Sequence, residues 1–136
     1  MESRISDCAA LHEKGYNCAQ AIACAYADLV GADKQTLFAA TEGLGLGMGG
    51  MEGTCGALNG ACVICGLAKS GADLDNPTTK GATYKVSREL VSRFNEACGA
   101  TRCRDLKGVD TGEVLCSCPK CIENAARILE EVVFID

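Results

Sequence analysis

A chain of 136 residues with a net charge of -5 fits one domain of ordinary size, and its acidity argues against nucleic acid and anionic membranes as partners, since both demand a basic face. Aromatic residues make up 4% of the chain and tryptophan is absent, so the core must be built from alanine, aliphatic, cysteine and methionine side chains in closely packed helices. The first residues lack the apolar core of a signal peptide, and the longest apolar stretch, residues 54–68, is too short and glycine-broken to span a bilayer, so we expect a soluble cytoplasmic protein with no membrane insertion.

Capping residues and apolar spacing predict three helices in the first third of the chain. Apolar positions at helical spacing form one face of a first helix, which Gly15 ends. Asn17 and Gln20 form a capping box at the start of a second helix, which stops at Gly31. Asp33 then caps a short third helix.

A run of glycines between residues 43 and 50 breaks the chain before the fourth helix. It contains the pattern G-x-G-x-x-G, which indicates a dinucleotide-binding loop only where a β-strand precedes it, and the preceding segment reads as helix. A flexible or left-handed connection is the preferred interpretation. The fourth helix then carries apolar residues and thiols on one stripe, namely Met51, Cys55, Leu58, Cys62 and Cys65.

The second half of the chain predicts two further helices. Residues 73–79 form the clearest surface turn, and the long helix that follows ends at Gly99. Residues 100–117 are irregular and predict a loop. Pro119 is typical of the first helical position, which makes Cys118 the expected cap of the last helix.

These elements define the expected fold. β-Branched residues are sparse and do not alternate with polar ones, so no strand is predicted. Residues 1–136 should form a single all-α domain, a compact bundle of five to six helices with a Gly-rich loop before the central helix. Small helical domains with alanine-rich faces often associate, so a homodimer is compatible with the sequence.

Four cysteines lie where the local sequence favours a thiolate over a thiol. Cys18 takes the first position of the second helix, Cys121 falls in the first turn of the last helix, and Cys55 follows the glycine run. Cys103 lies between two arginines. Unpaired N–H groups, the helix dipole and neighbouring cations lower the pKa of a thiol, and the thiolate attacks disulfides or binds metal. The sequence therefore points to sulfur chemistry.

The chain has eleven cysteines, and the remaining seven need a separate explanation. Their number is odd and no export signal precedes them, so we expect reduced thiols rather than a disulfide framework. Cys8, Cys24 and Cys98 are assigned to core packing, because free cysteine behaves as a small hydrophobic residue. The spacings among the five cysteines from residue 98 to residue 121 match neither a zinc ribbon nor a ferredoxin.

Several segments together resemble a known family. They are residues 15–20 (GYNCAQ), residues 49–60 (GGMEGTCGALNG), Cys103-Arg104, and Cys121 with Ala125-Ala126. In this order and spacing, the chain resembles the bacterial redox-active proteins of the C_GCAxxG_C_C family over nearly its whole length.

The resemblance implies a redox role and four characteristic cysteines, which map onto Cys18, Cys55, Cys103 and Cys121. It implies no particular substrate, cofactor or partner. Of the other thiols, those expected near the site are Cys62, Cys65 and Cys118.

Three function classes follow. The first two require the four cysteines to lie close together in the fold, and the third does not. The first is a thiol–disulfide oxidoreductase or electron-transfer protein serving a redox partner protein or a small molecule, with Cys55 as the attacking thiolate and Cys18 as the resolving thiol. The second is a zinc or iron–sulfur protein that uses Cys18, Cys55, Cys103 and Cys121 as ligands. The third is a structural helical module with buried free cysteines and no cofactor.

Overall fold

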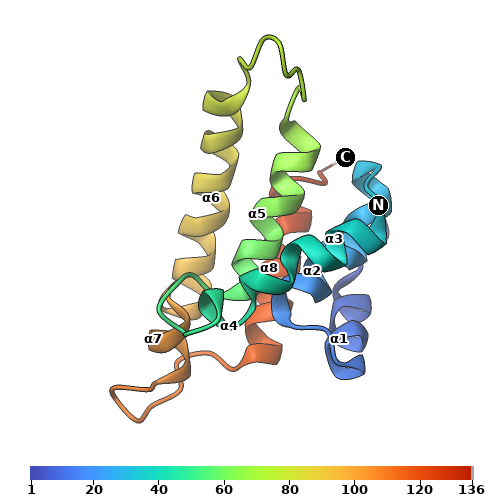
Figure 1. Ribbon diagram of the computed structural model, residues 1–136. Helices are drawn as coiled ribbons and strands as arrows, with labels where there is room; N and C mark the ends of the chain where they lie inside the picture. Colours follow the sequence, from blue (N-terminus) through green and yellow to red (C-terminus); the bar gives the residue numbers. More distant parts are fainter. Residues whose placement is uncertain (136) are drawn as a thin grey trace.

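The computed structural model describes residues 1–135, and the elements among them are helical (Figure 1). The helices are α1 (Ile5–Lys14), α2 (Cys18–Tyr26), α3 (Lys34–Thr41), α4 (Gly45–Met48), α5 (Gly56–Lys69), α6 (Lys80–Cys98), α7 (Cys103–Lys107) and α8 (Cys118–Val132). Two 3-10 turns, Ala27–Val30 and Glu42–Leu44, follow α2 and α3. Within the described part, only an isolated bridge between Thr54 and Arg102 resembles sheet. The predicted all-α class is confirmed, with more helices than the five to six expected.

Local capping explains where the N-terminal helices begin and end. The side chain of Asn17 accepts a hydrogen bond from the Gln20 amide at 2.9 Å, and the Gln20 side chain accepts one from the Asn17 amide at 3.0 Å. This is the predicted capping box. Gly15 ends α1 in the left-handed conformation, with φ of 117°, and Asp33 accepts a hydrogen bond from the amide of Thr36 at the start of α3.

The start of α8 differs from the prediction by one residue. Ser117, not Cys118, is the cap, and its hydroxyl accepts a hydrogen bond from the Lys120 amide. A serine hydroxyl is a strong N-cap acceptor, whereas a thiol is a weak one. Cys118 is therefore the first residue of α8 and Pro119 the second.

The connection between α4 and α5 is left-handed, as one of the two interpretations of the glycine run predicted. Three residues other than glycine have positive φ in this region: Leu46 and Met48 lie within α4, and Met51 lies in the connection itself. Because Met51 lies in this connection, the helical stripe predicted from residue 51 begins later, and Cys55 is the N-cap of α5. The backbone pairs with the segment around α7, since the Cys103 amide donates to the carbonyl of Gly53 at 3.0 Å.

Helix α5 is the centre of the bundle and packs against α2, α6 and α8. The contact with α2 is close because Gly60 faces the backbone of Ala19, where a Cβ atom would lie 2.7 Å from the carbonyl oxygen. Figure 1 shows that the loop joining α5 to α6 lies at one end of the molecule and that α4 and α7 lie at the other. The starts of α5 and α8 and the end of α6 reach this second end, which holds the candidate site.

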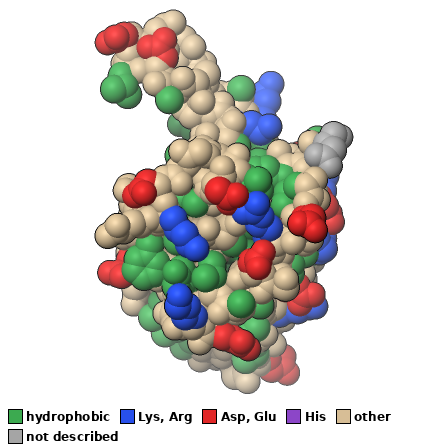
Figure 2. Space-filling model, turned by 90° about the vertical axis from the view of Figure 1, so that its right-hand side faces the viewer, with side chains coloured by type: hydrophobic (Ala, Val, Ile, Leu, Met, Phe, Trp, Pro, Cys, Tyr) green, Lys and Arg blue, Asp and Glu red, His purple; other side chains and the backbone are tan. Residues whose placement is uncertain are grey.

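The surface carries charges of both signs. Figure 2 shows lysine and arginine side chains interspersed with aspartate and glutamate on one face of the molecule, with apolar patches between them. In the part of the chain that the structure describes, no helix has both the length and the apolar character needed to cross a membrane.

Candidate functional site: a cysteine cluster at helix starts

Most of the cysteines gather at the end of the bundle that holds α4 and α7, where their thiols perturb one another's pKa values. The sequence separates these residues by up to a hundred positions, and the fold collects them from α2, α5, α6, α7, α8 and the loop before α8. We refer to them as the cysteine cluster. It consists of Cys18, Cys55, Cys98, Cys103, Cys116, Cys118 and Cys121.

Cys18 and Cys118 form the accessible edge of the cluster. Both are partly exposed, and their thiols are hydrogen-bonded to each other. The ammonium group of Lys107 donates a hydrogen bond to the sulfur of Cys118 at 3.2 Å. The Cys18 hydrogen bond and the Lys107 charge together lower the pKa of Cys118 to about 5. The same hydrogen bond raises the pKa of Cys18, which holds the shared proton.

Cys55 and Cys121 form a second thiol pair in the interior. The hydrogen bond from Cys121, with the N–H groups of Ala57 and Leu58, lowers the pKa of Cys55 despite its burial. Cys55 lies at the N-cap of α5, which explains why these two amides are free to point at its sulfur. The pKa of Cys121 is raised by its interactions with the neighbouring Cys55 and Cys98 thiols and by burial. Its S–H donates a hydrogen bond to the carbonyl of Cys116 at 3.6 Å.

Cys121 also belongs to a tight group with Cys98 and Cys116. The three sulfur atoms all lie within 4.8 Å of one another, and all three residues are buried. The side-chain amide of Asn124 donates a hydrogen bond to the sulfur of Cys98 at 3.4 Å. The hydrogen bonds from Cys121 and Asn124 lower the pKa of Cys98 to about 6. Burial raises the pKa of Cys116.

Cys103 is buried beneath the left-handed connection. A Cβ atom on Gly47 would lie 2.5 Å from the Cβ of Cys103, so the loop backbone rests directly on this residue. The flanking arginines had led us to expect a lowered pKa for Cys103. In the structure, burial raises it. The side chains of Arg102 and Arg104 form ion pairs with Glu52, and neither is a cause of the pKa shift at Cys103.

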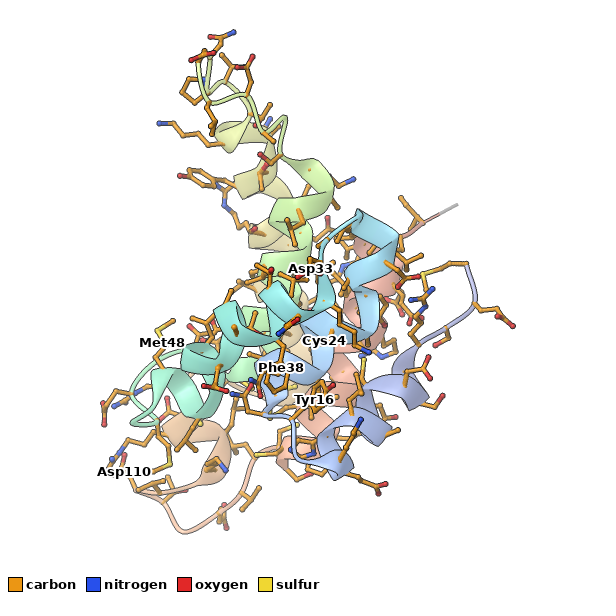
Figure 3. The ribbon with its side chains drawn as sticks, turned by 45° about the vertical axis from the view of Figure 1, so that its right-hand side comes forward. Tyr16, Cys24, Asp33, Phe38, Met48 and Asp110 are labelled. Atoms are coloured by element: carbon orange, nitrogen blue, oxygen red, sulfur yellow. The ribbon has the colours of Figure 1, made fainter. Side chains whose placement is uncertain are left out.

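The structure separates the remaining thiols from the cluster. Cys62 and Cys65, which were expected near the site, lie further along α5, where the hydroxyl of Ser87 donates to the Cys65 sulfur at 3.7 Å. Cys8 and Cys24 are buried in the core, where they had been assigned. The thiol of Cys24 donates a hydrogen bond to the carbonyl of Lys34 at 3.8 Å. Met48 and Asp110 mark the end of the molecule that holds the cluster, and Figure 3 shows Cys24 well away from both.

Sequence reasoning did not identify Cys98 and Cys116 as site residues. Cys98 was assigned to packing, although it ends α6 beside α8. Cys116 was left without a role, although its separation from Cys121 by four residues falls within the range of paired metal ligands. The intervening Cys118 obscures that spacing.

The structure does not place the predicted metal ligands in one coordination group. In residues 1–135, the group of metal-ligating side chains whose donor atoms all lie within 4.8 Å is Cys98, Cys116 and Cys121. Of the four predicted ligands, this group contains only Cys121. The donor atoms of Cys18, Cys55 and Cys103 do not all fall within that distance of the group.

Comparison with protein families matches residues 16–132 to the family described as "Putative redox-active protein (C_GCAxxG_C_C)". The matched segment begins beside the cap of α2 and ends with α8, so it contains the whole cysteine cluster. No curated protein and no solved structure matches the chain.

Proposed function

Because the chain belongs to the C_GCAxxG_C_C family of redox-active proteins, we propose that it exchanges thiols and disulfides through Cys118 and Cys18. Cys118 makes the first attack, and Cys18 resolves the mixed disulfide. The observation that carries this proposal is a pair of partly exposed cysteines whose thiols shift each other's pKa, one of which, Cys118, accepts a hydrogen bond from the Lys107 ammonium group at 3.2 Å.

Exposure favours Cys118 over the predicted Cys55 as the attacking residue. Cys55 is only 6% exposed, so a disulfide of a protein or small molecule cannot reach it without opening the cluster. Cys118 lies at the start of a fifteen-residue helix and accepts a hydrogen bond from the Lys107 ammonium group, and both features stabilise a negative sulfur. Cys18 is kept in its predicted role as the resolving thiol.

The reaction proceeds in two exchange steps. The Cys118 thiolate attacks one sulfur of the substrate disulfide, a new S–S bond forms, and the other substrate sulfur leaves as a thiolate. The sulfur of Cys18 then attacks Cys118, which forms the Cys18–Cys118 disulfide and releases the second substrate thiolate. The cysteine pair loses two electrons and the substrate gains them. The proton of Cys18 goes to one released thiolate, and water supplies the proton of the other according to its pKa.

The test is to react the reduced protein with glutathione disulfide and to map the products by mass spectrometry. The wild type should form a Cys18–Cys118 disulfide. Cys18→Ser should accumulate a glutathione adduct on Cys118, because the resolving thiol is missing. Cys118→Ser should react at least about tenfold more slowly.

Cys24→Ser is the matched control, because its thiol is buried and bound to a carbonyl outside the cluster. It should react like the wild type. An unchanged rate in Cys118→Ser would overturn the proposal. A Cys18–Cys55 disulfide in the wild type would instead return the attack to Cys55.

A further inference from the structure

Cys98, Cys116 and Cys121 have the spacing of metal ligands. Their sulfurs all lie within 4.8 Å of one another, and the residues are 4%, 7% and 2% exposed. A tetrahedral zinc ion holds thiolates at about 2.3 Å, which puts neighbouring sulfurs about 3.8 Å apart. A contraction of about 1 Å at most therefore brings the three sulfurs onto one ion.

The buried side-chain amide of Asn124 lies against these sulfurs and points its N–H groups at them. Asn124 is 8% exposed, and its Nδ2 atom lies 3.4 Å from the sulfur of Cys98 and 4.0 Å from that of Cys116. Arg127 donates a hydrogen bond to the Asn124 oxygen at 3.3 Å, which fixes the amide with its N–H groups toward the sulfurs. Donors aimed at sulfur are the usual outer shell of a thiolate metal site.

Cys55 supplies a fourth sulfur. It belongs to the same packed core cluster as Cys98, Cys116 and Cys121 and is as buried as they are. Cys55 is the N-cap of α5, so its sulfur lies beside the free amides of the first turn of that helix. Four cysteines complete the tetrahedral coordination of a closed site.

Without a cation, these four thiols have too few S–H donors to give every sulfur a hydrogen bond. Cys121 has three sulfur neighbours and the carbonyl of Cys116 within hydrogen-bonding range, but its single S–H can donate to one of them. Deprotonation of several thiols in so small a volume would create strong repulsion. A divalent cation removes both difficulties.

We propose that Cys55, Cys98, Cys116 and Cys121 bind one thiophilic divalent cation of the zinc class in a closed tetrahedral site. Binding forms four metal–sulfur bonds and releases the protons of the coordinating thiols to solvent, with no change in oxidation state. The site shares no residue with the exchange pair, so it goes beyond the redox function and stands independently of it.

Cobalt is the probe that reports both stoichiometry and geometry. Reduced, chelator-treated protein is titrated with Co²⁺ without oxygen. We expect thiolate-to-cobalt charge transfer and the intense visible bands of tetrahedral Co²⁺, both saturating at one ion per chain, and we expect Zn²⁺ to remove them. Cys98→Ser and Cys116→Ser should weaken cobalt binding by at least about tenfold.

Two variants keep the result independent of folding defects. Asn124→Ala leaves all four sulfurs in place and removes only the amide contacts, so it should weaken cobalt binding about tenfold while the far-ultraviolet circular dichroism stays native. Cys118→Ser, which disables the exchange pair, should bind cobalt like the wild type, and so should Cys65→Ser, which removes a buried thiol outside the cluster.

Absence of the cobalt bands in the folded, reduced wild type would overturn the proposal. Full-strength bands in Cys98→Ser would do the same. Loss of the bands in Cys18→Ser and Cys103→Ser, with retention in Cys98→Ser and Cys116→Ser, would assign the ion to the four cysteines predicted from the sequence instead.

Discussion

Gly47 is the residue at which the loop backbone comes closest to the cysteine cluster. Its φ is +56°, and a Cβ atom would lie 2.5 Å from the Cβ of Cys103 and 2.9 Å from the carbonyl oxygen of Gly53. Neither neighbour is the flexible end of a side chain, so an added methyl group can be accommodated only by moving backbone. The residue thus holds the loop against Cys103.

Gly47→Ala should therefore lower the free energy of unfolding by about 2–4 kcal/mol, of which about 1 kcal/mol reflects the left-handed backbone and the rest the clash. Gly49→Ala is the matched control, because its φ of +94° is also unfavourable but nothing lies within 4 Å of its Cβ position. Urea denaturation measures both variants. An equal loss of unfolding free energy in the two variants would show that the close contact with Cys103 does not contribute to stability.

The buried thiol of Cys8 makes the free energy of unfolding fall at alkaline pH. Burial raises the pKa of its thiol from 9.0 to about 12. The groups that face it are the Tyr26 phenol and Glu130, together with Asp7 on its own helix. Above pH 9 the unfolded chain releases the Cys8 proton while the folded protein retains it. The contribution of Cys8 to the free energy of unfolding is therefore complete below pH 9 and is lost as pH rises toward 12.

We expect the stability difference between the wild type and Cys8→Ala to shrink steadily from pH 9 upward. The Tyr26 phenol, whose pKa is raised chiefly by burial and by Glu130, is present in both proteins, so the part of its contribution that does not depend on Cys8 cancels in the comparison. Urea denaturation at a series of pH values provides the measurement. Parallel curves for the two proteins would contradict the expectation.

At the scale of the helix, α5 contains two glycines with opposite roles. Gly60 lies against α2, where a Cβ atom would meet the Ala19 carbonyl oxygen at 2.7 Å and the Cβ of Ile22 at 3.0 Å. Gly66 lies in the same helix, and nothing would lie within 4 Å of its Cβ. The first permits close packing of two helices, and the second only weakens the helix.

Gly60→Ala should lower the free energy of unfolding by about 1–3 kcal/mol, because α2 and α5 must separate. Gly66→Ala should raise it by about 0.5–1 kcal/mol, because alanine favours the helix. Thermal unfolding followed by circular dichroism compares the pair. A stabilising Gly60→Ala would mean that the two helices are not in the close contact described.

The sequence predicts the elements whose signals are local. Asn17 with Gln20 and the glycines at positions 15 and 99 define helix ends through their own chemistry. Helix α7 escapes prediction because it has five residues and no side-chain cap. Its first amides bond instead to the carbonyls of Gly53 and Met51, which lie fifty residues earlier in the chain.

For the whole molecule, burial divides the thiols into two classes. Three are partly exposed, namely Cys18, Cys62 and Cys118, and the other eight are buried. Because the thiolate is the reactive form and Cys118 is the one of these three whose pKa is lowered, a brief maleimide treatment of the reduced native protein should label Cys118 first and three thiols at most. The denatured protein should label eleven, as counted by intact mass. Rapid labelling of more than three would show that the cluster opens readily in the native state.

The composition of the cluster is a property of the whole fold, which limits what the sequence predicts about it. Cys18, Cys55 and Cys121 were identified from helix-start signals that act over a few residues. Cys98 ends a helix and Cys116 lies in a loop, so no helix-start signal marks them, and Cys118 obscures the spacing between Cys116 and Cys121. They join the others because α6 and α8 pack side by side, which depends on long-range contacts.

The contact between Cys18 and Cys118 also sets an order of events during synthesis. A ribosome adds about 5–20 residues per second, so Cys18 emerges roughly 5–20 s before the residue it pairs with. During that interval Cys18, Cys55 and Cys103 have left the ribosome without α8 to cover them. The nascent chain therefore passes through a period in which these thiols are uncovered, and that period ends only when α8 has been translated and packs against them.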